Sequence, residues 1–429
     1  ELNVTVVDSN QDKIKQWNGD LNNLPVYEPG LKNIISQVRD KNLFFSSDIS
    51  HAIKKSQMIF MAVNTPTKTK GKGAGMAADL KYVRSCARTI SRESESDKIV
   101  VEKSTLPVRT AEEIKKILKS GNKGVHFEVI SNPEFLAEGS AIQDLFKSDR
   151  VLIGGDDSKT GKRAVKSLVE IYLKWIPKEK IITTNVWSSE LSKLASNAFL
   201  AQRISSINSL SALCEKTGAD INEISLAVGM DHRIGSKFLN PSVGFGGSCF
   251  QKDILNLVYL SLHYGLREVA DYWMQVVKIN DYQKLRFSKK ILSYLKKNFQ
   301  RKKVAILGWA FKANTKDSRE SAAIYITNYL IEAGVNIQIY DPMVSENQII
   351  SDLFFLWRNI GFNDSQIKNL SKKLKIMPSI EDSLKDVAAV GIVTEWDEFK
   401  KYNWSKIDKK IKIFDGRNIL ENSFYTIGK

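Results

Sequence analysis

The sequence predicts an α/β protein in which two doubly wound parallel-sheet domains are joined by a central helical domain with a long connecting helix. In the first third, short β-rich runs alternate with helical stretches, which is the rhythm of βα units. Helical patterns dominate the middle third, and the βα rhythm returns in the last third. We therefore expect Rossmann-like domains over residues 1–186 and 299–429, with the helical domain over residues 187–298.

The first domain is expected to contain short strands rich in apolar and β-branched residues. These strands are Val4–Val7, Leu43–Ser46, Met58–Val63, Ile99–Glu102, Phe127–Ile130 and Val151–Gly154. A helix over Gln11–Asn18 should follow the first strand directly. This order of elements predicts a mainly parallel sheet.

The central domain should begin with a long helix, because Glu190–Lys216 contains almost no helix breaker before Gly218. Further helices are expected over Gln251–Leu262 and Val269–Asn298. The last domain should form strands over Val304–Leu307, Ile337–Tyr340, Ala389–Val393 and Ile411–Phe414.

The composition narrows the class of protein. The 429 residues, 42% of them hydrophobic, can bury the cores of two or three domains. The formal net charge of +16 is assigned to a solvated lysine surface, and no nucleic-acid partner is expected, because the lysine clusters lack stacking aromatic residues. No apolar run approaches the roughly 20 residues of a membrane span, and nothing resembles a signal peptide. We expect a cytoplasmic protein without a membrane partner.

Three cysteines occur, so one would stay unpaired, and no short-range disulfide framework is visible. This count suits a reducing cytosol. Cys86 and Cys214 lie in apolar helical patterns and are expected in the core.

Asp8 ends the first expected strand, where a dinucleotide-binding fold places the acid that binds the adenosine ribose. The glycine-rich phosphate turn of that fold lies about 20 residues earlier. Only seven residues precede Asp8, and none of them is glycine. The missing strand would be the central one of its sheet, and its absence would leave the backbone groups of two buried strands unpaired. We therefore expect the sequence to be a fragment without its first strand and glycine loop.

The third cysteine, Cys249, follows a glycine turn at the start of an expected helix. Ser248 and Gln251 should form a capping box, which would make Cys249 the first helical residue. The helix dipole and free amides there favour a thiolate, and Asp253 lies one turn further on the same face. A lone cysteine is usually a small buried hydrophobe, but this combination favours a nucleophile.

Other polar groups lie in positions that suit chemistry. Glu190, Lys193 and Asn197 share one face of the long helix, a pattern that alone is typical of a solvated stripe. Beside the cysteine segment, the stripe offers a cation and an amide to a developing oxyanion. Lys103–Pro107 and Ser131–Gly139 follow strands directly, so Thr105, Glu134 and Glu138 should lie at the carboxyl edge of the sheet, where ligands bind.

Taken together, these segments make the chain resemble the UDP-glucose 6-dehydrogenase family, the animal type more than the bacterial sugar-nucleotide relatives. The similarity runs from about Val4 to Gly428. Its markers are Leu24–Leu31, Val63–Lys68, Glu102–Arg109, Asn132–Gly139, Ser188–Phe199, Phe238–Asp253 and Phe414–Arg417.

The resemblance implies an N-terminal NAD domain, a helical dimerising middle and a C-terminal UDP-binding domain. It implies NAD-dependent four-electron oxidation of UDP-glucose to UDP-glucuronate, with Cys249 forming a thiohemiacetal and then a thioester. Lys193 and Asn197 would steady the oxygen at carbon 6. Asp253 and Glu134 would orient water and manage protons, and Thr105 would belong to the same water network.

The resemblance also implies binding residues, by position in this sequence. Those on the NAD side are Asp8, Lys13, Val63, Asn64, Thr65, Pro66, Ser104, Thr105, Glu138 and Arg319. Those on the sugar-nucleotide side are Glu134, Phe135, Leu136, Ala137, Glu138, Lys193, Asn197, Phe238, Asn240, Val243, Gly244, Phe245, Gly246, Phe311, Lys312 and Arg417. Arg233 would reach the substrate of a neighbouring subunit in a dimer-based hexamer. No metal site is expected.

Three departures from the family pattern stand out. Without the glycine loop, the chain as written should bind NAD poorly. Asn240 stands where the animal pattern has lysine, and the tail after Arg417 is short. Two alternatives stay open: a dehydrogenase for another nucleotide sugar, such as UDP-N-acetylmannosamine or GDP-mannose, or a non-catalytic subunit that assembles with intact homologues.

Overall fold

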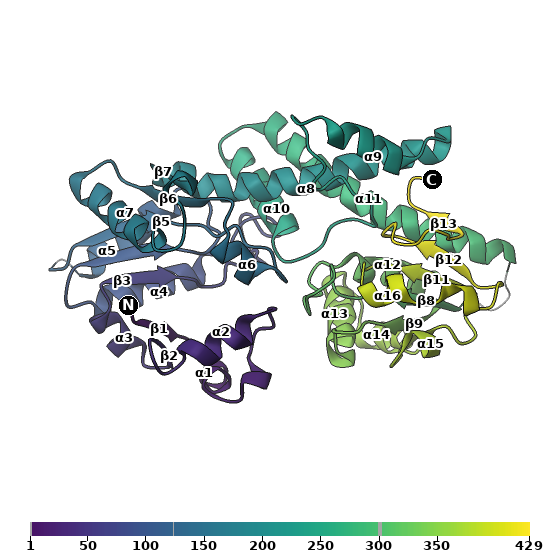
Figure 1. The fold of residues 1–429 in the computed structure, drawn as a ribbon, viewed down its shortest axis with the longest axis horizontal. Coiled ribbons are helices and arrows are strands. Elements are labelled where there is room, and N and C mark those ends of the chain that lie inside the picture. The colour runs from purple at the N-terminus through teal and green to yellow at the C-terminus, as the bar shows by residue number, and fades with distance from the viewer. Residues whose placement is uncertain (1, 123, 299–302) are drawn as a thin grey trace. The chain divides into compact units, whose positions relative to one another are not determined.

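The computed structural model describes residues 2–122, 124–298 and 303–429 (Figure 1). The chain divides into two compact units, Glu1–Ser196 and Asn197–Lys429. The predicted α/β class, with Rossmann-like parallel sheets and a central helical region, is confirmed. The expected start of the last domain, residue 299, lies outside the described residues.

The first unit contains two sheets. The smaller consists of β1 (Val4–Val7) and β2 (Leu43–Ser46), paired in parallel. The larger has the order β3 (Met58–Met61), β4 (Lys98–Glu102), β5 (Phe127–Ser131), β6 (Val151–Gly155) and β7 (Ile181–Asn185). Its strands pair in parallel except β5 and β6, which meet in an antiparallel contact at Ser131 and Gly154. With one antiparallel contact among otherwise parallel pairings, the sheet is mainly parallel, as predicted.

The two sheets are separate because no described strand joins them. Among the described residues, β1 pairs only with β2, and β3 pairs only with β4, so each has one edge without a strand partner. Val4 and Val6 of β1 are exposed, whereas the sequence predicted buried strands.

The larger sheet is covered by helices on both faces. Successive residues of a strand point to opposite faces of a sheet, so each face has its own core cluster. Val100 of β4 packs in one core cluster, and Val101 packs in another. The helices of the unit are α1 (Gln11–Asn18), α2 (Leu31–Val38), α3 (Ile49–Lys55), α4 (Lys81–Glu93), α5 (Thr110–Gly121), α6 (Ala141–Phe146) and α7 (Lys159–Tyr172). Helices α4 and α5 supply one cluster, and α7 supplies the other. Both faces are therefore apolar, as in doubly wound sheets.

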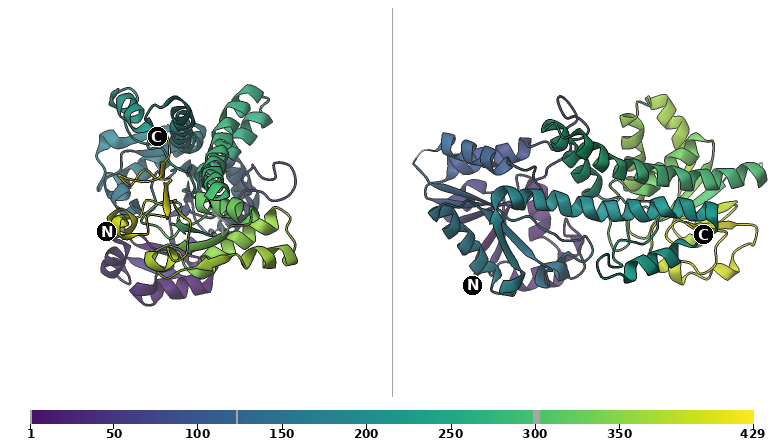
Figure 2. Two further views of the ribbon diagram at one scale, coloured as in Figure 1. Left: turned by 90° about the vertical axis from the view of Figure 1, so that its right-hand side faces the viewer. Right: turned by 90° about the horizontal axis from the view of Figure 1, so that it is seen from above.

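The central region consists of four helices. They are α8 (Val186–Thr217), α9 (Ile221–Met230), α10 (Phe250–His263) and α11 (Arg267–Asn298). Figure 2 shows α8 as one unbroken helix, as the sequence predicted. No helix among the described residues is long and apolar enough to cross a membrane.

The C-terminal part of the second unit holds a six-stranded parallel sheet in the order β10-β9-β8-β11-β12-β13 (Figure 1). Its strands are β8 (Lys303–Leu307), β9 (Asn336–Tyr340), β10 (Leu374–Ile376), β11 (Ala389–Ile392), β12 (Lys412–Asp415) and β13 (Tyr425–Thr426). Its helices are α12 (Ala322–Glu332), α13 (Glu346–Asn359), α14 (Asp364–Ser371), α15 (Ile380–Ser383) and α16 (Asp397–Lys401). Phe287, Ile291 and Leu295 of α11, spaced four residues apart, are buried in the core of this sheet.

Candidate active site

In the first unit, the loops after β3 and β4 are joined by side-chain hydrogen bonds. The Ser104 hydroxyl donates to the carbonyl of Val63 at 2.6 Å, and the Thr65 hydroxyl donates to the carbonyl of Thr105 at 3.2 Å. Thr65 is buried, whereas Asn64 is exposed. The residues expected on the NAD side, Val63–Pro66, Ser104 and Thr105, therefore lie together at the carboxyl edge of the sheet.

Asp8 lies at the end of β1, as predicted. Its carboxylate accepts a hydrogen bond from the backbone amide of Asn10 at 2.8 Å, and the Lys13 ammonium lies 3.9 Å away. Both side chains are partly exposed. An accessible carboxylate at this strand end suits a ribose hydroxyl.

The loop after β5 is anchored to α8 by charge. The Lys193 ammonium lies 3.2 Å from Oε1 of Glu134, and Oε2 of Glu134 accepts a hydrogen bond from the Leu136 amide at 2.7 Å. The Phe135 ring has two cations nearby, with Arg150 at 3.9 Å and Lys193 at 5.4 Å from its centroid. The predicted segment Glu134–Ala137 and the predicted Lys193 are thus brought together.

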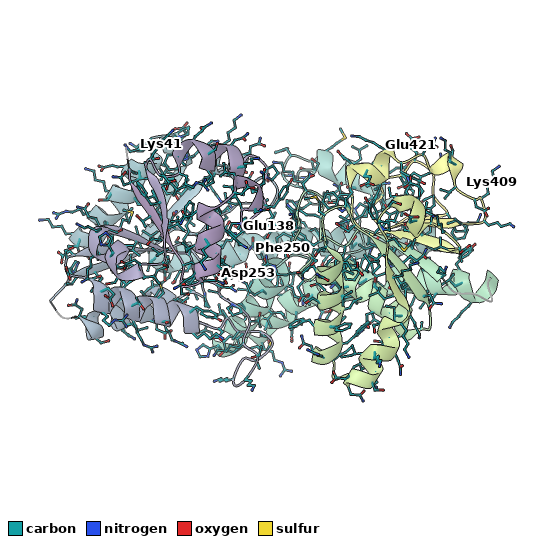
Figure 3. The ribbon with its side chains drawn as sticks, turned by 90° about the horizontal axis from the view of Figure 1, so that it is seen from below. Lys41, Glu138, Phe250, Asp253, Lys409 and Glu421 are labelled. Atoms are coloured by element: carbon teal, nitrogen blue, oxygen red, sulfur yellow. The ribbon has the colours of Figure 1, made fainter. Side chains whose placement is uncertain are left out.

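The same loop continues through Glu138 toward α6 (Figure 3). Glu28 lies in the marker segment Leu24–Leu31 but was not among the predicted site residues. Its carboxylate accepts hydrogen bonds from the amides of Gly139 and Ala141 at 2.9 and 2.7 Å. Glu28 thereby holds the loop end that carries Glu138.

The polar face of α8 is buried, so its interpretation as a solvated stripe is wrong. Glu190, Lys193 and Asn197 are 3%, 4% and 6% exposed. Glu190 accepts hydrogen bonds from the amides of Arg109 and Ala111, at 2.7 and 2.8 Å, and so holds the start of α5. The buried Glu190 carboxylate therefore has hydrogen-bond partners, because the backbone amides at the start of a helix have no partner within the helix.

Glu190 has a buried carboxyl neighbour that the sequence did not reveal. Glu102, the last residue of β4, is 1% exposed. Burial raises the pKa of Glu190 to about 7. Burial and the charge of Glu190 hold the pKa of Glu102 well above its usual range.

In the second unit, Cys249 precedes the first helical residue of α10. It is the N-cap residue, with φ −101° and ψ −53°, and makes no side-chain cap bond. The expected capping box of Ser248 and Gln251 is therefore wrong. Gln251 instead donates to the Glu320 carboxylate at 3.1 Å, while the Ser248 hydroxyl lies 3.6 Å from the Cys249 sulfur. A contact distant in sequence has replaced the local cap.

Asp253 lies on the first turn of α10, together with Phe250 (Figure 3). It is 1% exposed, and the Asn197 amide donates to its Oδ2 at 2.6 Å. The predicted amide on α8 thus contacts the predicted acid on α10.

The glycine turn before Cys249 is held by Asn280 of α11, which the sequence analysis missed. The Phe245 amide donates to Oδ1 of Asn280 at 2.8 Å, and Nδ2 of Asn280 donates to the Phe245 carbonyl at 3.0 Å. A Cβ at Gly244, whose φ is +118°, would lie 2.6 Å from the same Oδ1. A Cβ at Gly246 would lie 2.6 Å from the Glu320 carbonyl. The turn needs glycine because neighbouring groups approach its backbone closely.

Several further residues expected on the sugar-nucleotide side lie around this turn. Arg417 donates to the Phe311 carbonyl at 2.8 Å, and a Cβ at Gly247 would lie 3.0 Å from the Phe311 ring. Lys312 lies 5.8 Å from that ring. Val243 is buried and its amide donates to the Gly416 carbonyl at 2.9 Å.

The remaining predicted residues lie on exposed segments of the second unit. Phe238 has a positive φ of 64° and packs edge-to-face on Phe250, and Asn240 is exposed. Arg233 and Arg319 each form an ion pair with an aspartate two residues earlier, at 2.6 Å. Arg319 is thus in a different unit from the other NAD-side residues.

Three family descriptions match the chain in order. They are the NAD binding domain of the UDP-glucose/GDP-mannose dehydrogenase family at residues 1–176, its central domain at 187–282 and its UDP binding domain at 305–422. The chain belongs to the UDP-glucose/GDP-mannose dehydrogenase family.

Individual members of this family are similar over nearly the whole chain. UDP-glucose 6-dehydrogenase 1 of Arabidopsis thaliana is 52% identical, over 98% of this chain and 89% of its own length. The UDP-glucose 6-dehydrogenase of Pongo abelii is 53% identical, over 100% and 87%. The solved UDP-glucose dehydrogenase of Pyrobaculum islandicum superposes with a TM-score of 0.82 at 29% identity, covering 99% of this chain and 91% of that one.

The candidate site residues described above fall within all three matched domains. Glu134, Lys193 and the carboxyl-edge loops fall in the NAD binding and central matches, while Cys249 and Asp253 fall in the central match. Phe311, Lys312 and Arg417 fall in the UDP binding match.

Proposed function

We propose that the protein oxidises UDP-glucose at carbon 6 to UDP-glucuronate in two NAD-dependent steps. The observation that carries the proposal is Cys249 at the start of α10, one turn before a buried Asp253 that Asn197 holds. Identity above 50% to UDP-glucose 6-dehydrogenases of plants and animals supports this substrate. Covalent catalysis needs a nucleophile together with groups that transfer protons and bind the reacting oxygen, and Cys249, Asp253 and Asn197 are residues of these types.

In the first oxidation, the alcohol at carbon 6 would give a proton to the protein, and a bound NAD would supply the acceptor for the hydride, which would leave an aldehyde. The Cys249 sulfur adds to this aldehyde and forms a thiohemiacetal. Loss of a second hydride and proton gives a thioester. Water then attacks the thioester carbonyl, the carbon–sulfur bond breaks, and the uronate leaves with the thiol restored.

The other predicted residues support these steps. Lys193 and Asn197 steady the oxygen at carbon 6 as it gains negative charge. Glu134 and Asp253 take protons and orient the attacking water, with Thr105 in the same water network. The ion pair of Glu134 with Lys193 and the hydrogen bond of Asn197 to Asp253 keep acid and donor together.

The residues of the first unit fit an NAD molecule at the carboxyl edge of the sheet. When bound, NAD supplies the hydride acceptor. Asp8 and Lys13 would hold its adenosine side, and Val63–Pro66, Ser104, Thr105 and Glu138 would hold the remainder. Arg319 of the second unit is the further predicted contact. The accessible Asp8 carboxylate and the hydrogen-bonded loops are the features that support this assignment.

The sugar nucleotide is proposed to bind the second unit and the Glu134 loop. Phe238, Asn240, Val243–Gly246, Phe311, Lys312 and Arg417 would contact its nucleotide side, and Glu134–Glu138 would contact the sugar. Lys312 supplies positive charge for phosphate oxygens, and Arg417, whose guanidinium lies 2.7 Å from the Glu395 carboxylate, supplies a hydrogen-bond donor. Asn240 supplies no positive charge, so we expect weaker diphosphate binding than with lysine at that position.

We further propose a cytoplasmic homo-oligomer, a dimer-based hexamer, with domains over residues 1–186, 187–298 and 299–429. Many large apolar side chains on the helices of the second unit, and at Leu266 between α10 and α11, are exposed, which is typical of surfaces that oligomers bury. They are Phe199, Leu210, Leu213, Leu226, Met230, Leu262, Leu266 and Val269. Arg233, on the exposed loop after α9, would reach the substrate of the neighbouring subunit.

The direct test is a substrate panel with the purified protein, at NAD concentrations high enough to offset the weak NAD binding expected of the chain as written. We expect UDP-glucose to yield two NADH for each UDP-glucuronate. GDP-mannose and UDP-N-acetylmannosamine should react at least about 100-fold more slowly in kcat/KM, since a site built to hydrogen-bond particular hydroxyls rejects altered sugars. Faster turnover of either sugar, or of none, would overturn the proposal.

A further inference from the structure

Two residues that precede α12, Arg319 and Glu320, lie against the glycine turn before Cys249. The Gly247 amide donates to the Arg319 carbonyl at 2.8 Å. A Cβ at Gly246 would lie 2.6 Å from the Glu320 carbonyl, so the two backbones approach closely at this point. The backbone at Glu320 therefore fixes the part of the turn that lies two and three residues before Cys249.

The Glu320 side chain contacts the chain on the other side of Cys249. Its Oε2 accepts hydrogen bonds from Nε2 of Gln251 at 3.1 Å and from the Tyr325 hydroxyl at 2.5 Å. Gln251 lies on the first turn of α10, whose N-cap residue, Cys249, makes no side-chain cap bond. A helix start without a capping side chain is less well fixed. The contact from Glu320 therefore matters more to the position of this helix start.

Tyr325 gives the Glu320 carboxylate a firm partner. It lies on the first turn of α12, and the Lys284 ammonium of α11 lies 4.1 Å from the centroid of its ring. Lys284 is 1% exposed, and its ammonium also lies 3.1 Å from the Asp281 carboxylate. A cation over an aromatic ring is attracted by the negative face of the ring. Through Tyr325, Glu320 thus connects the start of α10 to α11 and α12.

Glu320 has an unusual backbone conformation. Its φ is +54°, in the left-handed region that residues other than glycine rarely adopt. Such a conformation is unfavourable and persists only where surrounding contacts impose it, which is common at functional sites. In this conformation the carbonyl lies beside Gly246 while the carboxylate reaches Gln251. One residue thereby contacts the chain both before and after Cys249.

We propose that Glu320 is a positioning residue that fixes the Cys249 sulfur for its attack on the aldehyde. The inference rests on the proposed function, in which the sulfur acts only after the first oxidation. In the attack, a carbon–sulfur bond forms and the thiol proton passes to the aldehyde oxygen, so no oxidant is consumed. A reacting atom displaced by about 1 Å can slow such a step about 100-fold. A displaced sulfur would leave the aldehyde time to escape.

The first test removes the Glu320 carboxylate. Glu320→Ala should lower kcat for uronate formation about 30-fold, because a hydrogen bond to a charged group is lost. KM for UDP-glucose should change by less than about threefold, because the substrate does not touch Glu320. The first oxidation does not use the sulfur, so the NADH formed per UDP-glucuronate should rise above two. A ratio that stays at two while kcat falls would overturn the inference.

Conservative and exchanged variants test the hydrogen bond itself. Glu320→Gln keeps an acceptor for Gln251 and should keep kcat within about threefold. Gln251→Glu alone sets two carboxylates against each other and should lose kcat as Glu320→Ala does. The double variant Gln251→Glu with Glu320→Gln restores an amide–carboxylate pair and should recover kcat. A double variant no faster than Gln251→Glu would contradict the inference, even should Glu320→Ala not fold.

Glu332→Ala is the matched control. Glu332 lies at the exposed end of α12 and accepts a hydrogen bond from the Asn328 amide at 2.8 Å, so this variant also removes a glutamate–amide pair. It should keep both kcat and the ratio of two NADH per UDP-glucuronate. An equal loss in Glu332→Ala would show that the effect of Glu320→Ala is not specific to the Cys249 turn.

Hydrogen exchange of backbone amides separates this inference from the proposed function. In Glu320→Ala, peptides covering residues 244–254 should exchange at least about fivefold faster than in the wild-type protein, while peptides from α13 should be unchanged. Unchanged exchange at residues 244–254 contradicts the inference whether or not the protein oxidises UDP-glucose. Failure of the substrate panel alone contradicts only the proposed function.

Discussion

Two groups of candidate site residues are held in place by different forces. In the first unit, Glu134 forms an ion pair with Lys193, and the buried acids Glu102 and Glu190 lie close together, so titratable groups dominate. In the second unit, the turn before Cys249 is held by neutral amides, chiefly that of Asn280. Charge responds to pH, whereas amide hydrogen bonds respond to shape. The first group should therefore set the pH dependence of the protein, and the second should set its geometry.

The largest effect is expected from replacing the cysteine that follows the amide-held turn of the second unit. Cys249→Ser should abolish uronate formation, with kcat reduced at least about 1000-fold, because an alkoxide is far harder to form than a thiolate. Uronate and NADH would be quantified over a long incubation. Cys86→Ser is the control, since Cys86 packs against the core of the first unit, and it should retain kcat. An equal loss of kcat in both variants would show that Cys249 is not the nucleophile.

The next test concerns the shape of the turn. Gly244→Ala should raise KM for UDP-glucose by about 100-fold, because its Cβ would lie 2.6 Å from Oδ1 of Asn280 at a φ of +118°. Steady-state kinetics and thermal unfolding together measure the effect. The loss should be the same at pH 6 and pH 8, because the groups displaced are neutral amides.

Gly265→Ala separates crowding from backbone strain. Gly265 also has a positive φ, +75°, but a Cβ there meets nothing within 4 Å. That variant should lose about 1 kcal/mol of stability from its left-handed backbone and keep its KM. If Gly244→Ala behaves in the same way, the close approach of Asn280 does not control the turn.

The sequence predicted features that depend on local pattern. The strands Val4–Val7 and Leu43–Ser46 were predicted with their observed bounds, since their apolar runs end at turn residues. Strand β7 (Ile181–Asn185) was missed because three of its five residues are polar. Strand β13 (Tyr425–Thr426) was missed because two residues carry no periodicity. Local pattern therefore sufficed for elements that bury a regular apolar face.

The site shows the same limit. Cys249 and Asp253 could be singled out because one helix start contains both residues. The cap was wrong because Gln251 bonds to Glu320, 69 residues away. Asn280 was missed because it lies 35 residues from Phe245 in an ordinary helical pattern. A polar residue that is 0% exposed in the middle of a helix is a signal, but burial appears only in the folded chain.

The smallest expected effect tests the charge-held group through stability. Glu190 has its pKa raised to about 7 by burial, and that of Glu102 is raised as well. Because the folded-state pKa lies above the unfolded value, the contribution of this pair to stability is fully present below about pH 4.5 and is lost as pH rises through about 7. Glu102→Gln removes one acid that resists ionisation. It should raise Tm by about 3 °C at pH 8 and leave it unchanged at pH 4.

Glu179→Gln is the control for this stability difference, because Glu179 is exposed and loses the same formal charge. It should leave Tm within about 1 °C of the wild-type value at both pH values, as surface substitutions usually do. Thermal unfolding from pH 4 to pH 8 measures all three proteins. A Tm difference for Glu102→Gln that does not grow with pH would mean that ionisation of the buried pair has no role in stability. The contrast between the two units would then depend on the ion pair of Glu134 and Lys193 alone. The Glu134 side chain is partly exposed, so this ion pair contributes less to folding stability than a fully buried pair of interacting groups would.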